Sequence, residues 1–508
     1  MKKAFIAAPR ALQIPTQVPP VQAPPPPRVE PHALQWPLAP TESTMPAVDR
    51  DAMTGGKTTT ASENSDSSTT DLDFEATTLE DAEGQTSTKQ TTTKKPLEPT
   101  LSSRSQMSPS VEPSSPHTAA TKTPKVVGKP LLCTVRDRLF LAEQFPPDGM
   151  CDYIFFDSLY KDGNRNLLPD ETTYSKSLNV FLNDHRDYRH TTLGLGFAFN
   201  SLTKAEEDLE MRNPSPLARF WKRGIFHAGV IDPCARPTRD QTKASIASLK
   251  KINRLLDAQR ARGHTAITAI TAPQPDLRWT LSYTEDFSEL QFTPDLFVLF
   301  GHYRYGDNFR TNCAIVPPTI HPDDTPPGKL LEDYSFNLGT PVLSLRKLYD
   351  EGTDIIGLVS VTMKGRWAEP QFTNNVDFFE PCVPDFNTPS FGGMTDVCPG
   401  GGRLATQFNY STEHHAVITY IAFLRRTFVY DDEKAFAEKL CRAKSLGQNV
   451  PFGIAVYDID FEDYDNKCTK QNNNGAFSRL KVLRKAVDYF NKNSTSFNEN
   501  DCNAYVMT

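Results

Sequence analysis

The chain has 508 residues, and its 55 basic and 62 acidic residues give a net charge of −7. This charge excludes binding of nucleic acid through bulk positive charge, so no nucleic-acid partner is expected. The first 125 residues contain 18 of the 41 prolines but three of the 51 aromatic residues. Such a segment cannot bury enough apolar surface to offset the entropy of ordering it. One folded region, residues 126–495, is therefore expected after a disordered tail.

The tail, residues 1–125, combines two compositions. Four consecutive prolines at 24–27 and repeated Pro-x-Pro spacing favour polyproline II backbone. Between residues 51 and 125, 29 of 75 residues are Ser or Thr. In a secreted protein this composition is typical of a mucin-like, O-glycosylated stalk, and it equally suits a plain disordered linker. Neither interpretation assigns chemistry to the tail.

All nine cysteines lie from Cys133 onward, and none forms a CxxC or CxxH pair typical of zinc sites. Disulfides, and hence secretion, are favoured, and no metal or cofactor is expected. Asn409 and Asn493 begin Asn-x-Ser/Thr sequons and are candidate N-glycosylation sites, although sequons also arise by chance.

The first residues give a weaker indication of targeting than the cysteines do. The start is basic, but its apolar core spans residues 4–8, shorter than the ~7–15 residues of a signal peptide. The leader is therefore expected to be incomplete or unconventional. No run of about 18 apolar residues predicts a membrane-spanning helix.

Eight short apolar segments follow the tail. Most are continuous hydrophobic runs, which is typical of strands buried on both faces. The predicted strands are 131–135, 152–157, 192–199, 225–231, 265–271, 296–301, 355–361 and 452–459.

Helical patterns separate several of these strands. Apolar stripes at 246–256, 343–348 and 436–443 each precede a glycine that suits a helix end. An amphipathic helix is predicted at 477–490, whereas the third and fifth helices are weakly marked. Eight strand–helix repeats predict an α/β fold, a (β/α)8 TIM barrel.

The C-terminal part carries a family resemblance. Residues 428–447 and 451–468, FVYDDEKAFAEKLCRAKSLG and PFGIAVYDIDFEDYDNKC, resemble the seventh helix and eighth strand of family 18 glycoside hydrolases, the chitinases and chitinase-like lectins. Residues 355–367 resemble the seventh strand of that family. Cys133 and Cys151 match its disulfide-linked pair.

The same resemblance predicts an insertion within the folded region. Residues 368–430 are too long for a structureless loop and are expected to form the small α+β insertion that walls the groove in family 18 chitinases. Residues 496–508 are expected to be a C-terminal tail. The resemblance also suggests that Cys382 pairs with Cys441, although connectivity cannot be deduced from one sequence and nine cysteines leave at least one unpaired.

The sequence departs from the family pattern at the acidic residues on the fourth strand that catalyse glycoside hydrolysis. Active members carry Asp-x-x-Asp-x-Asp-x-Glu on the fourth strand, where the glutamate protonates the glycosidic oxygen. Residues 223–234, RGIFHAGVIDPC, contain Asp232 as their sole acid. Asp232 is a weak candidate for a relocated general acid, and a turn or cap role is the alternative. The resemblance therefore implies a pseudoenzyme.

Other positions implied by the resemblance also differ. His302 and Tyr303 replace a Tyr-Asp pair, Lys364 replaces a tyrosine, and Tyr457 stands at the position of a floor tryptophan. Aromatic residues near strand ends suit stacking on a sugar ring, and equally suit packing in the barrel. The candidate carbohydrate-binding residues are Tyr457, Trp367, Asp458, His302 and Tyr303.

Acidic residues at 458–465 resemble the family's eighth-strand end and are expected to be structural. His414 and His415 lack HExxH spacing, which favours a solvated loop over a metal site.

Three functions fit these patterns. The leading hypothesis is a secreted, non-catalytic chitinase-like protein whose barrel groove binds chitin or other glycans. The second is an active glycosidase that uses Asp232 as a relocated acid. The third is a structural or protein-interaction module with a filled pocket and protein partners that the sequence does not identify.

Overall fold

The computed structural model describes residues 128–508 apart from Asp137, 162–164, 169–173, 184–186, 211–214, 235–236, 274–276, 304–311, Ser335, 385–389, 399–406, Asn473 and 494–495. The Pro-, Ser- and Thr-rich tail expected at 1–125 lies outside the described residues. Within the described residues, no helix has the length and apolar character needed to cross a membrane.

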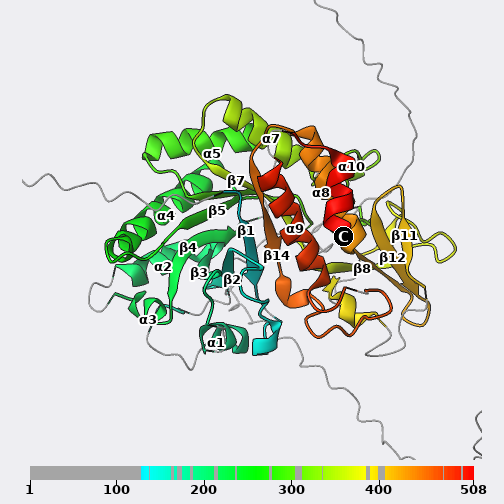
Figure 1. Cartoon of the computed structure of the whole chain (residues 1–508), viewed down its shortest axis with the longest axis horizontal. Coiled ribbons are helices and arrows are strands. Elements are labelled where there is room, and N and C mark those ends of the chain that lie inside the picture. The colour runs from blue at the N-terminus through cyan, green and yellow to red at the C-terminus, as the bar shows by residue number, and fades with distance from the viewer. Residues whose placement is uncertain are drawn as a thin grey trace, which may run out of the picture. The chain divides into compact units, whose positions relative to one another are not determined.

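Eight parallel strands close into a barrel in the order β1-β14-β7-β6-β5-β4-β3-β2, with helices around it (Figure 1). This confirms the predicted (β/α)8 barrel, and each barrel strand overlaps one predicted segment. The barrel strands are β1 (Leu131–Val135), β2 (Tyr153–Leu159), β3 (Thr192–Ala198), β4 (Ile225–Asp232), β5 (Thr268–Ala272), β6 (Leu296–Leu299), β7 (Ile356–Thr362) and β14 (Phe452–Tyr457).

Two of the long helices begin at a residue whose side chain caps the helix. The side chain of Thr238 accepts a hydrogen bond from the Gln241 backbone at the start of α4, and Asp432 accepts one from the Ala435 backbone at the start of α8. The helices are α1 (Lys176–Asn183), α2 (Leu202–Leu209), α3 (Ala218–Trp221), α4 (Arg239–Arg260), α5 (Leu277–Leu290), α6 (Leu330–Asp333), α7 (Gly339–Asp350), α8 (Glu433–Leu446), α9 (Ser478–Lys492) and α10 (Glu499–Met507).

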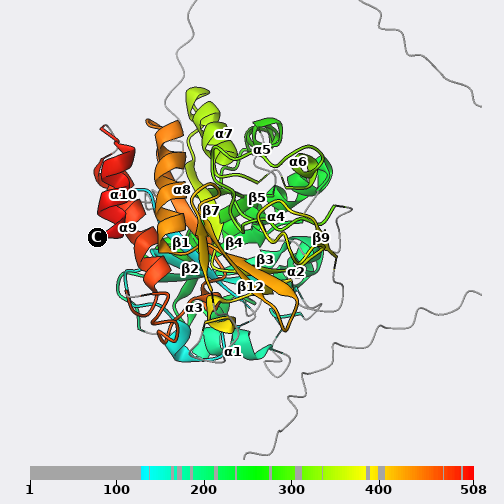
Figure 2. The ribbon, with the colours of Figure 1, turned by 90° about the vertical axis from the view of Figure 1, so that its right-hand side faces the viewer.

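The last of these helices lies in residues 496–508, which were expected to be a tail. Helix α10 lies beside α8 and α9 (Figures 1 and 2). The disulfide between Cys441 on α8 and Cys502 on α10 fixes it there. The C-terminal residues are therefore part of the folded region.

The residues that follow β7 and precede α8 in the chain form an antiparallel sheet, where the insertion was expected (Figure 2). Its strands follow the order β10-β8-β13-β12-β11, and β9 also pairs with β8. The insertion strands are β8 (Gly365–Pro370), β9 (Cys382–Val383), β10 (Phe391–Gly392), β11 (Asn409–Ser411), β12 (Ala416–Ile421) and β13 (Arg426–Tyr430).

Side chains fill the interior of the barrel. Phe155, Phe300 and Tyr457 belong to one buried cluster inside it. Glycine provides the space that these rings need, because a Cβ on Gly194 would lie 2.6 Å from the ring of Phe155. The barrel therefore has a packed core rather than a pore.

Four disulfides stabilise the fold, and all nine cysteines lie in described residues. The predicted pair Cys133–Cys151 is confirmed. The suggested pairing of Cys382 with Cys441 is wrong, because Cys382 bonds to Cys313 and Cys441 bonds to Cys502, each at a Cα separation that suits a disulfide. The fourth pair is Cys398–Cys468, and Cys234 is the unpaired cysteine that an odd number requires.

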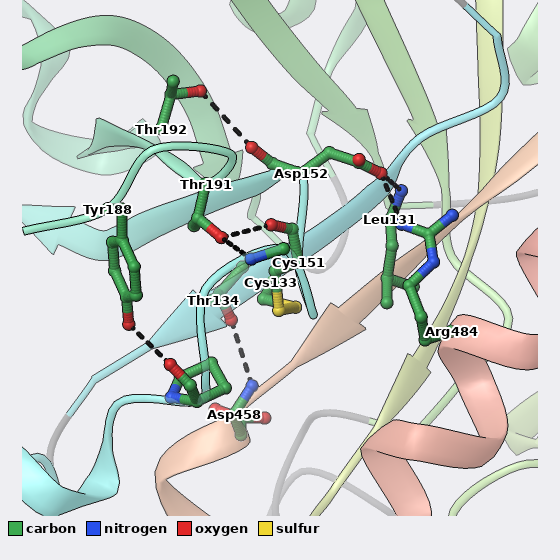
Figure 3. Close-up of a disulfide and its surroundings, with 12 residues drawn as sticks. Leu131, Cys133, Thr134, Cys151, Asp152, Tyr188, Thr191, Thr192, Asp458 and Arg484 are labelled. Carbon is green, nitrogen blue, oxygen red and sulfur yellow. Dashed lines mark hydrogen bonds and ion pairs between the residues drawn. A yellow bond between two sulfur atoms is a disulfide. The ribbon is translucent and has the colours of Figure 1, made fainter. Parts of the chain in front are cut away.

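The first disulfide lies within a network that fixes the start of the barrel (Figure 3). Asp152 Oδ2 accepts hydrogen bonds from the Leu131 backbone, at 2.6 Å, and from the guanidinium of Arg484 on α9, at 2.8 Å. Thr191 Oγ1 donates to the carbonyl of Cys151 at 2.7 Å. The beginnings of β1, β2 and β3 are thus held together.

We expect removal of the last disulfide to destabilise the protein. The double variant Cys441→Ser/Cys502→Ser opens a loop of 61 residues and should lower the free energy of unfolding by about 2–4 kcal/mol. Chemical denaturation measures this loss. The matched control is Cys234→Ser, which breaks no disulfide, and an equal loss in both variants would contradict the assignment.

Candidate functional site

Tyr457 fills the centre of the barrel mouth, at the carboxyl end of β14. It is 1% exposed, and its ring lies 5.3 Å from that of Phe300 and 4.9 Å from that of His302, between ring centroids. Its hydroxyl donates to the Ile231 carbonyl at 3.0 Å and lies 2.9 Å from Thr271 Oγ1. Strands β4, β5 and β14 are thereby joined across the interior, and the face predicted to stack on a sugar is covered by protein.

His302 and Tyr303 follow β6, as the family resemblance implies. His302 is 3% exposed, and its Nδ1 lies 2.8 Å from Ser360 Oγ. Burial lowers the pKa of His302 to about 3, against the opposing effect of Asp458, so its imidazole is neutral at physiological pH. Tyr303 is also buried, and the guanidinium of Arg366 lies 4.2 Å from its ring centroid.

Asp458 follows Tyr457 and forms a buried ion pair. Its Oδ1 lies 2.7 Å from Nζ of Lys364, and its Oδ2 accepts a hydrogen bond from Thr362 Oγ1 at 3.0 Å. Its backbone has a left-handed conformation, with φ of 60°, and the backbone N–H donates to Thr134 Oγ1. These contacts engage both carboxylate oxygens inside the protein.

A second buried carboxyl group lies close to this pair. Burial, and then the charge of Asp458, raise the pKa of Asp460 to about 7. Its Oδ2 accepts a hydrogen bond from the Arg138 backbone at 2.7 Å. The acidic run after β14 thus lies within the fold.

Strand β4 presents glycine and isoleucine to the interior. Gly229 has no room for a side chain, since a Cβ there would lie 2.8 Å from the carbonyl oxygen of Ala269. Ile231 belongs to the interior cluster. The candidate acid Asp232 is the last residue of β4, and its Oδ2 lies 2.6 Å from Nζ of Lys161. The Ser158 hydroxyl donates a hydrogen bond to the same oxygen at 3.3 Å.

The remaining sequence-predicted residues lie apart from the mouth. Trp367 is on β8 in the insertion sheet and packs on Phe428 at 4.8 Å between ring centroids. Asn409 is exposed on β11. Asn493 is half-buried, and its amide donates to the carbonyl of Tyr489 at 3.1 Å.

The structure also contains two cavities that the sequence patterns did not indicate. One, of about 190 Å³, lies at the end of β2 and is lined by residues including Phe140, Asn166 and Lys176. The other, of about 380 Å³, lies beside the Cys313–Cys382 disulfide. The residues that line these cavities do not follow a regular apolar or charged pattern in the sequence. The sequence therefore gave no signal for either cavity.

Histidines of the insertion contact acidic residues. His414 Nδ1 lies 3.1 Å from Asp324 Oδ2, and His415 Nδ1 lies 2.6 Å from Glu438 Oε2. Within the described residues, no group of three or more histidine, cysteine or acidic side chains has a geometry that suits a metal ion.

No protein-family model matches the sequence, and no curated protein matches it. Similar solved structures include the class V chitinase from Nicotiana tobaccum, with a TM-score of 0.47 and 12% identity over 69% of this chain and 97% of that chain. The GH18 chitinase from Cycas revoluta has a TM-score of 0.44 and 11% identity over 67% and 98%. Catalytic domain 2 of the Ostrinia furnacalis group II chitinase has a TM-score of 0.46 and 12% identity over 71% and 96%. At these identities the likeness concerns the fold alone.

We expect the Asp458–Lys364 pair to be energetically coupled. Lys364→Met leaves a buried carboxylate without its partner and should cost about 3–5 kcal/mol of unfolding free energy. Adding Asp458→Asn should recover part of this loss, since asparagine tolerates the left-handed backbone. Denaturation of the single and double variants forms the cycle. Additive losses would show that the pair is not coupled.

Proposed function

We propose that the protein is a secreted, non-catalytic chitinase-like protein whose barrel acts as a structural or protein-interaction module. The observation that carries this proposal is the filled barrel mouth. Tyr457, His302 and Asp458 are each at most 4% exposed. The Tyr457 hydroxyl, His302 Nδ1 and the Asp458 carboxylate each contact other protein groups, so these side chains take the space in which a TIM-barrel enzyme holds its substrate.

The lack of catalysis is supported by β4. Glycoside hydrolysis requires a carboxylic acid placed beside the scissile oxygen. The inward positions of β4 carry His227, Gly229 and Ile231, none of which is a carboxylic acid, and Asp232 is paired with Lys161. Asp458 and Asp460 are each 4% exposed, and Asp458 is paired with Lys364.

Glycan binding remains the second candidate because of the cavity at the end of β2. The ring of Phe140 is 43% exposed at this cavity, and hydroxyl, amide and ammonium groups of Ser175, Asn166 and Lys176 line it. An apolar ring beside a few polar groups suits a small sugar. Contact with Tyr457 would instead require the side chains that cover it to move.

Secretion is supported by the four disulfides, which persist in oxidising compartments. Among the described residues, these bonds join segments that are 18 to 70 residues apart in the sequence. A reducing compartment would remove this stabilisation.

The proposal is tested with the full chain, incubated with chitin and chito-oligosaccharides. We expect no cleavage products and no retention on chitin, with an active family 18 chitinase as the parallel control. Turnover that Asp232→Asn abolishes would contradict the proposal and support the relocated acid. Retention that Phe140→Ala abolishes would support the glycan-binding candidate.

We expect N-glycosylation at Asn409 when the chain is secreted from eukaryotic cells behind a heterologous signal peptide. Asn409 is exposed on the edge strand β11, whereas the amide of Asn493 is engaged by the Tyr489 carbonyl. Asn409→Gln should remove the mass shift caused by N-glycanase, and Asn493→Gln should leave it. Loss of the mass shift in Asn493→Gln, but not in Asn409→Gln, would place the glycan on Asn493 instead.

A further inference from the structure

Three histidines meet where the insertion contacts a helix of the barrel. His321 comes from the segment that follows β6, and it is 7% exposed. His414 and His415 come from the turn between β11 and β12. Helix α8 lies against this turn through Glu438. None of the contacts described for the barrel mouth includes these residues.

The central contact is a stack of two imidazole rings. The centroids of His321 and His415 lie 4.1 Å apart, with an interplanar angle of 24°. His415 Nδ1 lies 2.6 Å from Glu438 Oε2, and the hydroxyl of Tyr410 donates to the same oxygen. The stack is favourable while at least one ring is neutral. Two protonated rings at this distance repel each other.

The second contact is between His414 and Asp324, at 3.1 Å. The ring of His414 also packs against Phe378 and Phe379, at 5.3 and 5.1 Å between ring centroids. This contact gains strength when His414 is protonated, since it faces a carboxylate. We therefore expect acid to weaken the contact between the insertion and α8 at the His321–His415 stack, and not at the His414–Asp324 contact.

Each segment that packs against the three histidines carries charged groups. The acidic ones are Asp323, Asp324, Glu413 and Glu438. The basic ones are Lys434, Lys439 and Arg442. Lys434 lies 3.8 Å from Glu438, and Arg442 lies 2.8 Å from Asp323. Lys439 lies 2.6 Å from Asp431.

Burial makes His321 hard to protonate. Burial, and then His415, lower the pKa of His321 to about 4, although Asp324 and Asp323 act in the opposite direction. An imidazole freed from the junction has a pKa near 6.5. The neutral form therefore stabilises the closed junction above pH ~6.5, and this stabilisation is lost as the pH falls toward 4.

Covalent bonds hold the insertion elsewhere. Cys313–Cys382 ties it to the segment after β6, and Cys398–Cys468 ties it to the loop after β14. The turn between β11 and β12 has no such bond, because residues 409–421 contain no cysteine. This corner can therefore separate from α8 while the insertion stays attached.

We propose that the His321–His415 stack is an acid-sensitive latch that releases the β11–β12 corner from α8 when both rings are protonated. The opened state exposes the face of α8 around Glu438 and the inner face of the corner. The exposed apolar groups are those of Phe378 and Phe379 together with the histidine rings. The latch is independent of the proposed function of the barrel, since it requires neither a ligand nor a partner.

The test uses the full chain and amide hydrogen exchange of residues 409–421 at pH 7.0 and 4.5, corrected for the intrinsic pH dependence of exchange. The protection factor of this corner should fall at least about tenfold at pH 4.5, while barrel strands keep theirs. In His321→Phe the fall should disappear, because a phenyl ring keeps the stack without adding a second charge.

The matched control is His264→Phe. His264 also stacks on an aromatic ring, that of Phe226 at 4.1 Å, but its stack involves no second histidine. This variant should keep the acid-induced loss. An unchanged loss in His321→Phe, or an equal loss in the barrel strands, would overturn the proposal. If His321→Phe does not fold, an NMR titration of His321 in the unaltered chain decides, and a midpoint near 6.5 would overturn it.

Discussion

The structure depends on one packing constraint: a closed barrel of eight parallel strands has a fixed interior that inward side chains must fill. Here aromatic rings supply much of that volume. Phe155, Phe300 and Tyr457 come from β2, the end of β6 and β14, and they meet in the interior. Rings of this size require small residues on neighbouring strands, which explains why Gly194 lies against Phe155.

The same constraint governs the chemistry of β4. Gly229 abuts the backbone of β5, and Ile231 occupies interior volume beneath Tyr457. Carboxylates at these two positions would collide with the neighbouring strand or displace the aromatic core. The absence of the acid motif is therefore tied to the packing of the whole interior. A single substitution to glutamate at either position would have to displace part of this packing.

The strands could be predicted from the sequence because burial on both faces leaves a continuous apolar run, which is a local signal. The burial of Tyr457 could not be predicted from the sequence. Its exposure depends on Phe300, His302 and Thr271, which are at least 155 residues away in the chain. The sequence correctly placed Tyr457 at a strand end. It did not indicate how deeply the ring would be buried.

Residues that join distant segments were equally hard to predict. Cys382 and Cys441 were recognised as disulfide cysteines, but their partners are 69 and 61 residues away and were not identified. Helix α10 lacks a clear apolar stripe, and its position is set largely by Cys502. Local patterns thus predicted the elements, whereas covalent and buried polar contacts between them required the structure.

The polar groups of the mouth show why this end of the barrel remains closed. A buried ion costs several kcal/mol unless it is paired, so each charge here needs a protein partner. Asp458 has Lys364, His302 stays neutral, and the pKa of Asp460 is raised toward 7, which limits the number of unpaired charges. A ligand entering the mouth would have to separate these partners and replace every contact. The insertion corner at His321 is held by a stack that needs at least one neutral ring, so motion is expected there in acid rather than at Tyr457.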